Sequence, residues 1–272
     1  MSLAAVLAGC ATTDPTQRFE RAAARAGFIA GEVAGTTFRH RTFTAPSPDG
    51  HRGTLLVYLG GDGTPFLGRS RIASDPTPRR PLTLELMARG PRPAVYLGRP
   101  CYHGLRAGCD PALWTVARYS EAVVASLTEA LTRLAAQHRA ERVVLVGYSG
   151  GGALALLVAE RQPTVDAVIT LAANLDTDAW TALHGYSPLV GSLNPADAAG
   201  NRRVLRHLHL TGDADANVPP FLHDRLRDRL PAEAFVTVPG FDHRCCWTKA
   251  WPSLAGVDRL IEPAPPARVA AP

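Results

Sequence analysis

Ser149 stands at the centre of a short glycine-rich segment that could carry out nucleophilic chemistry. The segment Gly-Tyr-Ser-Gly-Gly at 147–151 follows an apolar run at 143–146 and precedes the run Ala-Leu-Ala-Leu-Leu-Val-Ala at 153–159. A strand, a sharp turn at a serine and a helix predict a nucleophile elbow, whose strained turn holds the hydroxyl clear of the backbone. Glycines beside such a serine let the helix pack closely on its strand. We therefore predict that Ser149 is a catalytic nucleophile.

A serine hydroxyl is a weak nucleophile, so a base must accept its proton and an acid must orient that base. His243 closes the segment Val-Pro-Gly-Phe-Asp-His at 238–243, which follows a predicted strand. Histidine has the right basicity near neutral pH, so His243 is the predicted base. Three aspartates are candidates for the acid: Asp213, Asp215 and Asp242.

With these segments in order, the chain from about Thr54 to Trp251 resembles the α/β-hydrolases. In that family the triad follows the chain order serine, acid, histidine. The segment at 209–219 is similar to the family's Gly-x-x-Asp-x-x-Val-Pro, and this match implies that the acid is Asp215. The implied activity is hydrolysis of a small-molecule carboxylic ester through an acyl-enzyme on Ser149, without a cofactor or metal.

The resemblance also implies an oxyanion hole made of backbone N–H groups. One donor is the N–H of Gly150, the residue after the nucleophile. The other comes from the loop Leu-Gly-Gly-Asp-Gly at 59–63, from either Gly61 or Asp62. Many family members begin this loop with a histidine, whereas this chain has Gly60 there.

Three local motifs resemble a subgroup of bacterial, lipoprotein-like α/β-hydrolases: 99–101, 192–195 and 242–247. They support the fold and say nothing about substrate. The same machinery could also cleave amides or peptides or transfer acyl groups, and a non-catalytic envelope lipoprotein on this fold is a further alternative. A dinucleotide-binding enzyme is excluded, because Gly61-Asp62-Gly63 continues as Thr-Pro-Phe and not as Gly-x-Gly-x-x-Gly.

The chain begins with a short apolar run that leads to a cysteine, in the order Leu-Ala-Gly-Cys at 7–10. This pattern resembles the signal segment of bacterial lipoproteins and implies lipidation at Cys10 after removal of the preceding residues. The resemblance places the protein in the bacterial cell envelope, anchored to a membrane by lipid and facing the periplasm or exterior, with residues 11–17 as a tether. The alternative is an ordinary apolar N-terminus.

The other cysteines are two close pairs. Cys101 and Cys109 bracket a glycine-containing loop that can bring them together, so we predict a disulfide between them. Cys245 and Cys246 are adjacent, and we expect them to be free or paired elsewhere. The spacing of these cysteines does not match that of zinc sites.

The formal net charge of +5 comes almost entirely from arginine, since Lys249 is the only lysine. These arginines are scattered and often stand beside acids, as at 224–229. Because nucleic-acid binders concentrate their charge or carry a recognition motif, we predict a solvated surface and no nucleic-acid partner. For Arg99 we expect a structural ion pair in preference to a bound substrate carboxylate.

The 272 residues are 46% hydrophobic and 19% charged, which excludes general disorder. The pattern predicts an α/β fold: a mostly parallel, doubly wound sheet with helices on both faces, formed by residues 18–262. Segments 174–203 and 263–272 are predicted to be a small cap-like excursion and a loose tail. Strands are expected at 36–44, 54–60, 94–97, 142–146, 165–173, 205–211 and 234–238, the first two as a hairpin. Helices are expected at 15–26, 119–138, 150–162, 220–230 and 247–261.

Overall fold

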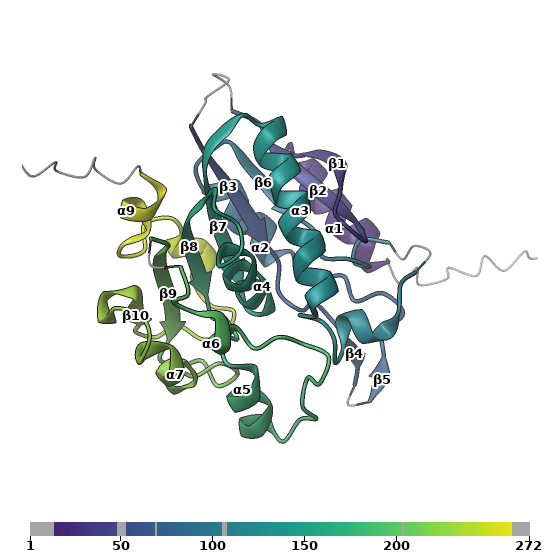
Figure 1. Cartoon of the computed structure of the whole chain (residues 1–272). Coiled ribbons are helices and arrows are strands. Elements are labelled where there is room, and N and C mark those ends of the chain that lie inside the picture. Colours follow the sequence, from purple (N-terminus) through teal and green to yellow (C-terminus); the bar gives the residue numbers. More distant parts are fainter. Residues whose placement is uncertain (1–13, 48–52, 69, 105–107, 203, 263–272) are drawn as a thin grey trace, which may run out of the picture.

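A single sheet of eight strands forms the centre of the computed structural model, which describes residues 14–47, 53–68, 70–104, 108–202 and 204–262 (Figure 1). Within these residues the sheet has the order β1-β2-β6-β3-β7-β8-β9-β10. The bounds are β1 Ile29–Ala34, β2 Arg39–Ala45, β3 Gly53–Leu59, β6 Ala94–Leu97, β7 Ala140–Tyr148, β8 Val165–Leu171, β9 Arg206–Gly212 and β10 Phe235–Val238. A separate two-stranded hairpin consists of β4 Phe66–Leu67 and β5 Arg71–Ile72.

Only β2 runs against the direction of its neighbours in this sheet. It pairs antiparallel with β1 and β6, while β6, β3, β7, β8, β9 and β10 pair parallel in turn. The predicted hairpin between the strands at 36–44 and 54–60 is therefore wrong, because β6 lies between β2 and β3. The antiparallel partners of β2 are instead β6 and β1, and β1 is a strand that the sequence patterns did not indicate.

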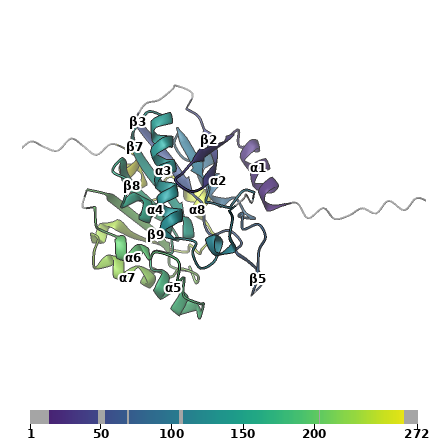
Figure 2. The same cartoon turned by 45° about the vertical axis from the view of Figure 1, so that its right-hand side comes forward.

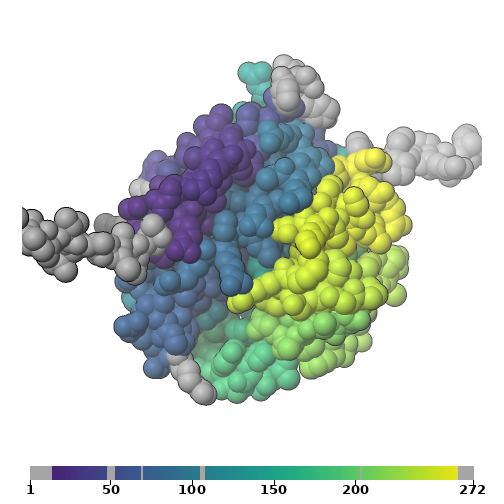
Figure 3. Space-filling model, turned by 180° about the vertical axis from the view of Figure 1, so that it is seen from behind, coloured from purple at the N-terminus to yellow at the C-terminus, as the bar shows by residue number. Residues whose placement is uncertain are grey.

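The central strands are apolar on both sides because helices cover both faces of the sheet. On one face, Leu55 and Val57 of β3 pack with residues of α3 (Glu121–Gln137) and α4 (Gly150–Ala159). On the other, Leu56 and Tyr58 pack against α1 (Pro15–Arg25), α2 (Leu82–Arg89), α8 (Trp247–Ala250) and α9 (Val257–Ile261). Figure 3 shows this second face, where a blue segment lies between the purple N-terminal segment and the yellow C-terminal segment.

Local sequence explains where several helices begin and end. Asp14 accepts a hydrogen bond from the N–H of Thr16 and Pro15 takes the first position of α1, so residues 15–17 of the predicted tether are helical. Ser120 caps α3 in the same way. The helix predicted at 247–261 is divided into α8 and α9, since Pro252 cannot continue a helix.

Two other predicted features differ in detail. The helix predicted at 220–230 is the 3-10 turn η2 (Pro220–His223) followed by α7 (Asp224–Arg227), and α2 was not predicted. The predicted signal segment 1–10, residues 11–13 of the tether and the tail 263–272 lie outside the described residues. None of the described helices combines the length and apolar character needed to cross a bilayer.

The excursion at 174–203 contains two short helices, α5 (Thr177–His184) and α6 (Pro195–Ala198). Together with α7 they lie at one end of the molecule, beyond the carboxyl edge of the sheet (Figure 2). The stretch between them is joined to the 3-10 turn η1 (Pro111–Trp114) and the residues after it: the N–H of Gly191 donates to the carbonyl of Val116, and that of Leu193 to Tyr119. The excursion therefore borders the edge at which β7 delivers Ser149.

Candidate active site

Ser149 occupies the sharp turn between β7 and α4, with φ of 52° and ψ of −127°. This left-handed region is unusual for a residue with a side chain, and it turns the hydroxyl away from both flanking elements. The neighbouring residues must be glycines, because a side chain there would overlap the backbone of an adjacent element. A Cβ on Gly147 would lie 2.5 Å from the carbonyl oxygen of Gly151, and one on Gly151 would overlap the carbonyl of Leu59. The elbow thus depends on close backbone packing between β3, β7 and α4.

His243 lies between Ser149 and Asp215 and contacts both. Its Nε2 is 3.1 Å from Oγ of Ser149, and its Nδ1 is 2.9 Å from Oδ2 of Asp215. Asp215 is in the loop after β9 and His243 in the loop after β10, two neighbouring strands whose carboxyl ends meet the end of β7 at one edge. The three residues predicted from the sequence are therefore brought together in hydrogen-bonded order.

The Asp215 carboxylate is buried and fixed from two sides. Its side chain is 0% exposed, and its Oδ1 accepts hydrogen bonds of 2.8 Å from the N–H groups of Asn217 and Val218. These bonds leave Oδ2 for His243. Because hydrogen bonds to an ionised carboxylate are strong, they stabilise the negative charge that an imidazolium at His243 requires.

The two alternative acids have other partners. Asp213 is exposed and accepts a hydrogen bond from the N–H of Gly240. Asp242 accepts from the N–H groups of Arg244 and Cys245, and these bonds lower its pKa. Both carboxylates therefore stabilise turns, and among the three candidates Asp215 is the one bonded to the imidazole.

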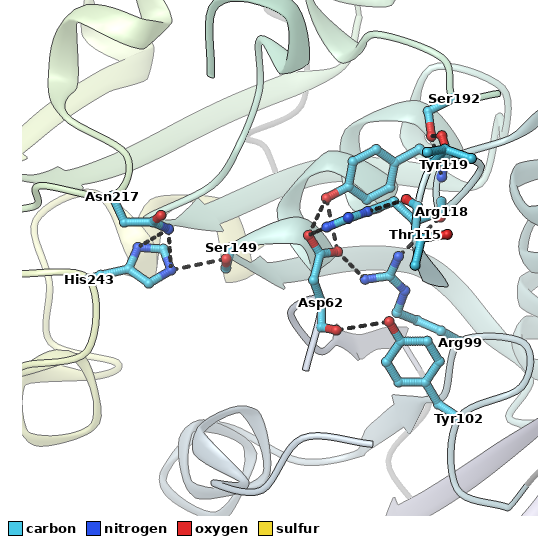
Figure 4. Close-up of polar contacts among 11 residues, drawn as sticks. Asp62, Arg99, Tyr102, Thr115, Arg118, Tyr119, Ser149, Ser192, Asn217 and His243 are labelled. Carbon is cyan, nitrogen blue, oxygen red and sulfur yellow. Dashed lines mark hydrogen bonds and ion pairs between the residues drawn. The ribbon is translucent and has the colours of Figure 1, made fainter. Parts of the chain in front are cut away.

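Two neighbours of the histidine were not predicted from the sequence. The side-chain nitrogen of Asn217 lies 3.2 Å from Nε2 of His243 (Figure 4). The Tyr148 hydroxyl donates to the His243 carbonyl at 2.7 Å. The carbonyl of Asn217 also contacts Nε2 of His184 on α5 at 2.8 Å. Tyr148 precedes the nucleophile, and Asn217 follows Asp215 by two residues. Their closeness in sequence to the predicted triad is the feature that could have identified them.

The predicted oxyanion loop passes directly beside the nucleophile. A Cβ on Gly61 would lie 3.2 Å from Cβ of Ser149, and one on Gly150 would overlap the Asp62 carboxylate. Within the described chain, the N–H groups of Gly61, Asp62 and Gly150 donate to no protein acceptor. They remain available to a bound group. A side chain at Gly150 would overlap Asp62, and one at Gly61 would press against Ser149.

The four remaining described cysteines form two disulfides. Cys101 and Cys109 are joined with their Cα atoms 5.6 Å apart, as expected from their spacing. Cys245 and Cys246 are joined to each other, in contrast to our expectation that they would be free or paired elsewhere. This vicinal pair begins two residues after His243 and therefore lies in the same loop as the histidine.

Arg99 forms the structural ion pair that we expected, with the carboxylate of Asp62. Among the aromatic residues, Trp247 and Trp114 are buried in the interior, whereas Trp180 and Tyr186 pack around His184 at the end of α5. In the described residues, no group of three or more histidine, cysteine or acidic side chains is arranged to hold a metal ion.

Comparison with known proteins identifies relatives of this architecture. Residues 102–211 match the model of the dienelactone hydrolase family, a stretch that includes Ser149 and ends before Asp215. A search of curated proteins finds no match.

Solved structures match most of the chain. An α/β serine hydrolase without a lid from Xanthomonas campestris is 15% identical with a TM-score of 0.50, covering 79% of this chain and 85% of its own. A proline iminopeptidase-related protein from Thermus thermophilus is 18% identical with a TM-score of 0.53, covering 80% and 91%. An esterase from Pyrococcus furiosus is 10% identical with a TM-score of 0.52, covering 79% and 84%. The chain has the α/β-hydrolase fold, and over residues 102–211 it is similar to dienelactone hydrolases.

Proposed function

We propose that this protein is a serine hydrolase that cleaves carboxylic esters through an acyl-enzyme on Ser149. One observation carries the proposal: Ser149, His243 and Asp215 form a continuous hydrogen-bonded chain with links of 3.1 and 2.9 Å. Such a chain activates a hydroxyl that is otherwise a poor nucleophile. The match of residues 102–211 to a hydrolase family supports the same reaction class.

The geometry supports a two-step reaction. Oγ of Ser149 attacks the ester carbonyl while Nε2 of His243 accepts the hydroxyl proton, and the resulting tetrahedral intermediate collapses when His243 protonates the departing alcohol. Water then attacks the acyl-enzyme and gives a proton to His243, and His243 passes this proton to Oγ of Ser149 as the acid product leaves. Asp215 holds Nδ1 of His243 throughout and stabilises its charged form.

The negative oxygen of each tetrahedral intermediate needs donors that are already in place. We assign this role to the N–H of Gly150 together with an N–H of the Gly61–Asp62 loop, since both lie beside Ser149 and donate to no described acceptor. In other hydrolases the loss of one such donor costs about 3 kcal/mol in transition-state stabilisation.

Amides, peptides and acyl transfer are the alternatives within the same chemistry. The structural relatives include both a named esterase and a protein related to an iminopeptidase, so relationship alone favours neither substrate. A matched ester and anilide of the same acyl group separate them. Ester preference by a factor of 100 or more supports the proposal, whereas faster anilide cleavage contradicts it.

The first experiment is labelling of the full chain, purified in mild detergent, with a fluorophosphonate probe. We expect the wild type to be labelled and to hydrolyse short-chain nitrophenyl esters, and Ser149→Ala to do neither, because the probe reacts only with an activated serine. Circular dichroism checks that the variant is folded. A folded wild type that resists labelling would remove the catalytic role and favour the non-catalytic lipoprotein.

We also propose that Cys10, which lies outside the described residues, becomes lipidated and tethers the enzyme to a bacterial membrane. The support is the order Leu-Ala-Gly-Cys at 7–10 after a short apolar run. Growth with an alkynyl fatty acid should label the wild type and leave Cys10→Ala unlabelled. Equal labelling of both, or of neither, contradicts the tether.

A further inference from the structure

Four side chains surround Asp62, the residue that follows Gly61 in the oxyanion loop (Figure 4). Arg99 and Arg118 bind one carboxylate oxygen each, Arg118 at 2.8 Å. The hydroxyl of Tyr119 donates to the same carboxylate, at 2.9 and 2.8 Å from its two oxygens, and the hydroxyl of Tyr102 donates to the Asp62 carbonyl at 2.9 Å. We call these four residues the Asp62 cage.

The cage is itself buried and held in place. Arg99 and Arg118 are 1% and 6% exposed. Arg99 also donates to the carbonyl of Arg118 at 3.0 Å, and Arg118 to that of Thr115 at 2.6 Å. The Arg99 guanidinium lies 4.9 Å from the ring centre of Tyr102 and 5.4 Å from that of Tyr119. Asp62 is therefore fixed at its backbone and at its side chain by groups that cannot easily move.

The protonation states in the cage are well defined. Burial by itself would raise the pKa of Asp62, but Arg118 and Arg99 lower it well below its usual range, so the carboxylate stays ionised. Burial raises the pKa of Tyr102 to about 12, and burial together with the charge of Asp62 raises the pKa of Tyr119 well above its usual value. Both tyrosines keep their protons and can donate. One carboxylate and two guanidinium groups leave one surplus positive charge.

The Asp62 carboxylate lies beside the place where a negative charge would develop. The Asp62 carboxylate is so close to Gly150 that a Cβ there would overlap it, and Gly150 begins α4 directly after the nucleophile. An unpaired carboxylate at this point would repel the oxyanion of a tetrahedral intermediate. Two arginines reverse the sign of the local charge, and the positive end of α4 acts in the same direction.

We infer that Arg99, Tyr102, Arg118 and Tyr119 are positioning residues for the oxyanion hole: they hold Asp62 so that its N–H points at the oxyanion, and their surplus charge favours that oxyanion. The inference rests on the proposed hydrolase function and extends it. It also explains why an acidic residue occupies a loop that must stabilise negative charge. The cage fixes the backbone of Asp62 through the bonds that it makes to the Asp62 carboxylate.

The test removes single hydroxyls from the cage and keeps every ring. Tyr119→Phe and Tyr102→Phe are compared with Tyr58→Phe, a buried tyrosine of β3 on the opposite face of the sheet. Because a loosened donor is still present, we expect kcat for a nitrophenyl ester to fall about tenfold in each cage variant, less than the loss on removing a donor. The KM should stay within about twofold of the wild type, since ester and intermediate differ in the charge on this oxygen.

A further measurement separates positioning from a structural role. Inhibition by an aryl boronic acid, which forms a tetrahedral adduct on the serine, should weaken in parallel with kcat. Each cage variant loses a hydrogen bond to Asp62, so a melting temperature somewhat below that of Tyr58→Phe is expected. Unchanged kcat, or a kcat loss that appears only together with a raised KM, overturns the inference and leaves the hydrolase proposal intact. A wild type without esterase activity or labelling overturns both.

Discussion

At the scale of single residues, two aspartates in one loop have opposite surroundings. Asp215 is buried, bonded to two backbone N–H groups and to His243, while Asp213 is exposed and bonded to the N–H of Gly240. Their separation is two residues, so neither residue type nor predicted element distinguishes them. What distinguishes them is that the Asp215 carboxylate, and not that of Asp213, is hydrogen-bonded to the imidazole of His243.

Exchange of Asp215 for asparagine should therefore be far more damaging than the same exchange at Asp213. An amide can donate to Nδ1 and so stabilise the wrong tautomer of His243, and it cannot balance an imidazolium. We expect kcat for ester hydrolysis to fall by about 10³- to 10⁴-fold in Asp215→Asn. Asp213→Asn is the matched control and should stay within about threefold of the wild type. Equal losses in the two variants would refute this assignment of the acid.

At the scale of elements, the elbow requires β3, β7 and α4 to approach more closely than side chains allow. Gly151 lies in the first turn of α4, where a Cβ would overlap the carbonyl of Leu59 in β3. At similarly short range, Gly147 at the end of β7 meets Gly151 and Gly152, and Gly152 meets Ala173. The helix can begin at the serine only because this turn carries no side chains.

Gly151→Ala should consequently destabilise the protein although alanine favours helix. In an exposed helix this exchange gains about 1 kcal/mol, whereas overpacking typically costs about 1–3 kcal/mol. We expect a net loss in the free energy of unfolding, measured with urea, together with a loss of activity as Ser149 is displaced. Gly185→Ala, at a left-handed position with open space around it, tests the backbone cost alone. A Gly151→Ala protein as stable as the wild type would show that the elbow can relax.

At the scale of the whole molecule, several histidines are buried without charge. Burial is the main cause that lowers the pKa of four of them: to about 4 in His40, His207 and His223, and to about 3 in His103. The pKa of His209 is lowered as well, again chiefly by burial. In the unfolded chain these groups take up protons near pH 6.5, so between about pH 6.5 and 4 the unfolded state binds more protons than the folded state.

Stability should therefore decrease as the pH falls through this window. Each such histidine contributes up to about 1.4 kcal/mol per pH unit to the slope of the unfolding free energy. We expect His207→Gln to reduce that slope by about one proton, since the ring nitrogens of His207 have no hydrogen-bond partner in the described chain. Urea titrations at several pH values between 7 and 4.5 measure the slope. Parallel curves for wild type and variant would contradict the prediction.

Much of the fold and the candidate site could be predicted because short-range physics decides them. Alternating apolar runs indicated seven strands of the sheet, and a serine between glycines after such a run indicated the elbow. Strands of a parallel sheet bring their carboxyl ends to one edge, so the loops carrying Asp215 and His243 were expected beside Ser149. The prediction of one helix at 247–261 was wrong, although Pro252 by its residue type indicates the break.

Tertiary structure alone decided which distant segments meet. The predicted hairpin failed because the neighbour of β2 depends on competition among all strands, and β6 takes the place beside it. The Asp62 cage could not be foreseen for the same reason, since Arg118 and Tyr119 come from a segment more than fifty residues farther along the chain. Local sequence determines turns, caps and apolar faces through sterics and burial, whereas long-range pairing is selected only when the whole core is assembled.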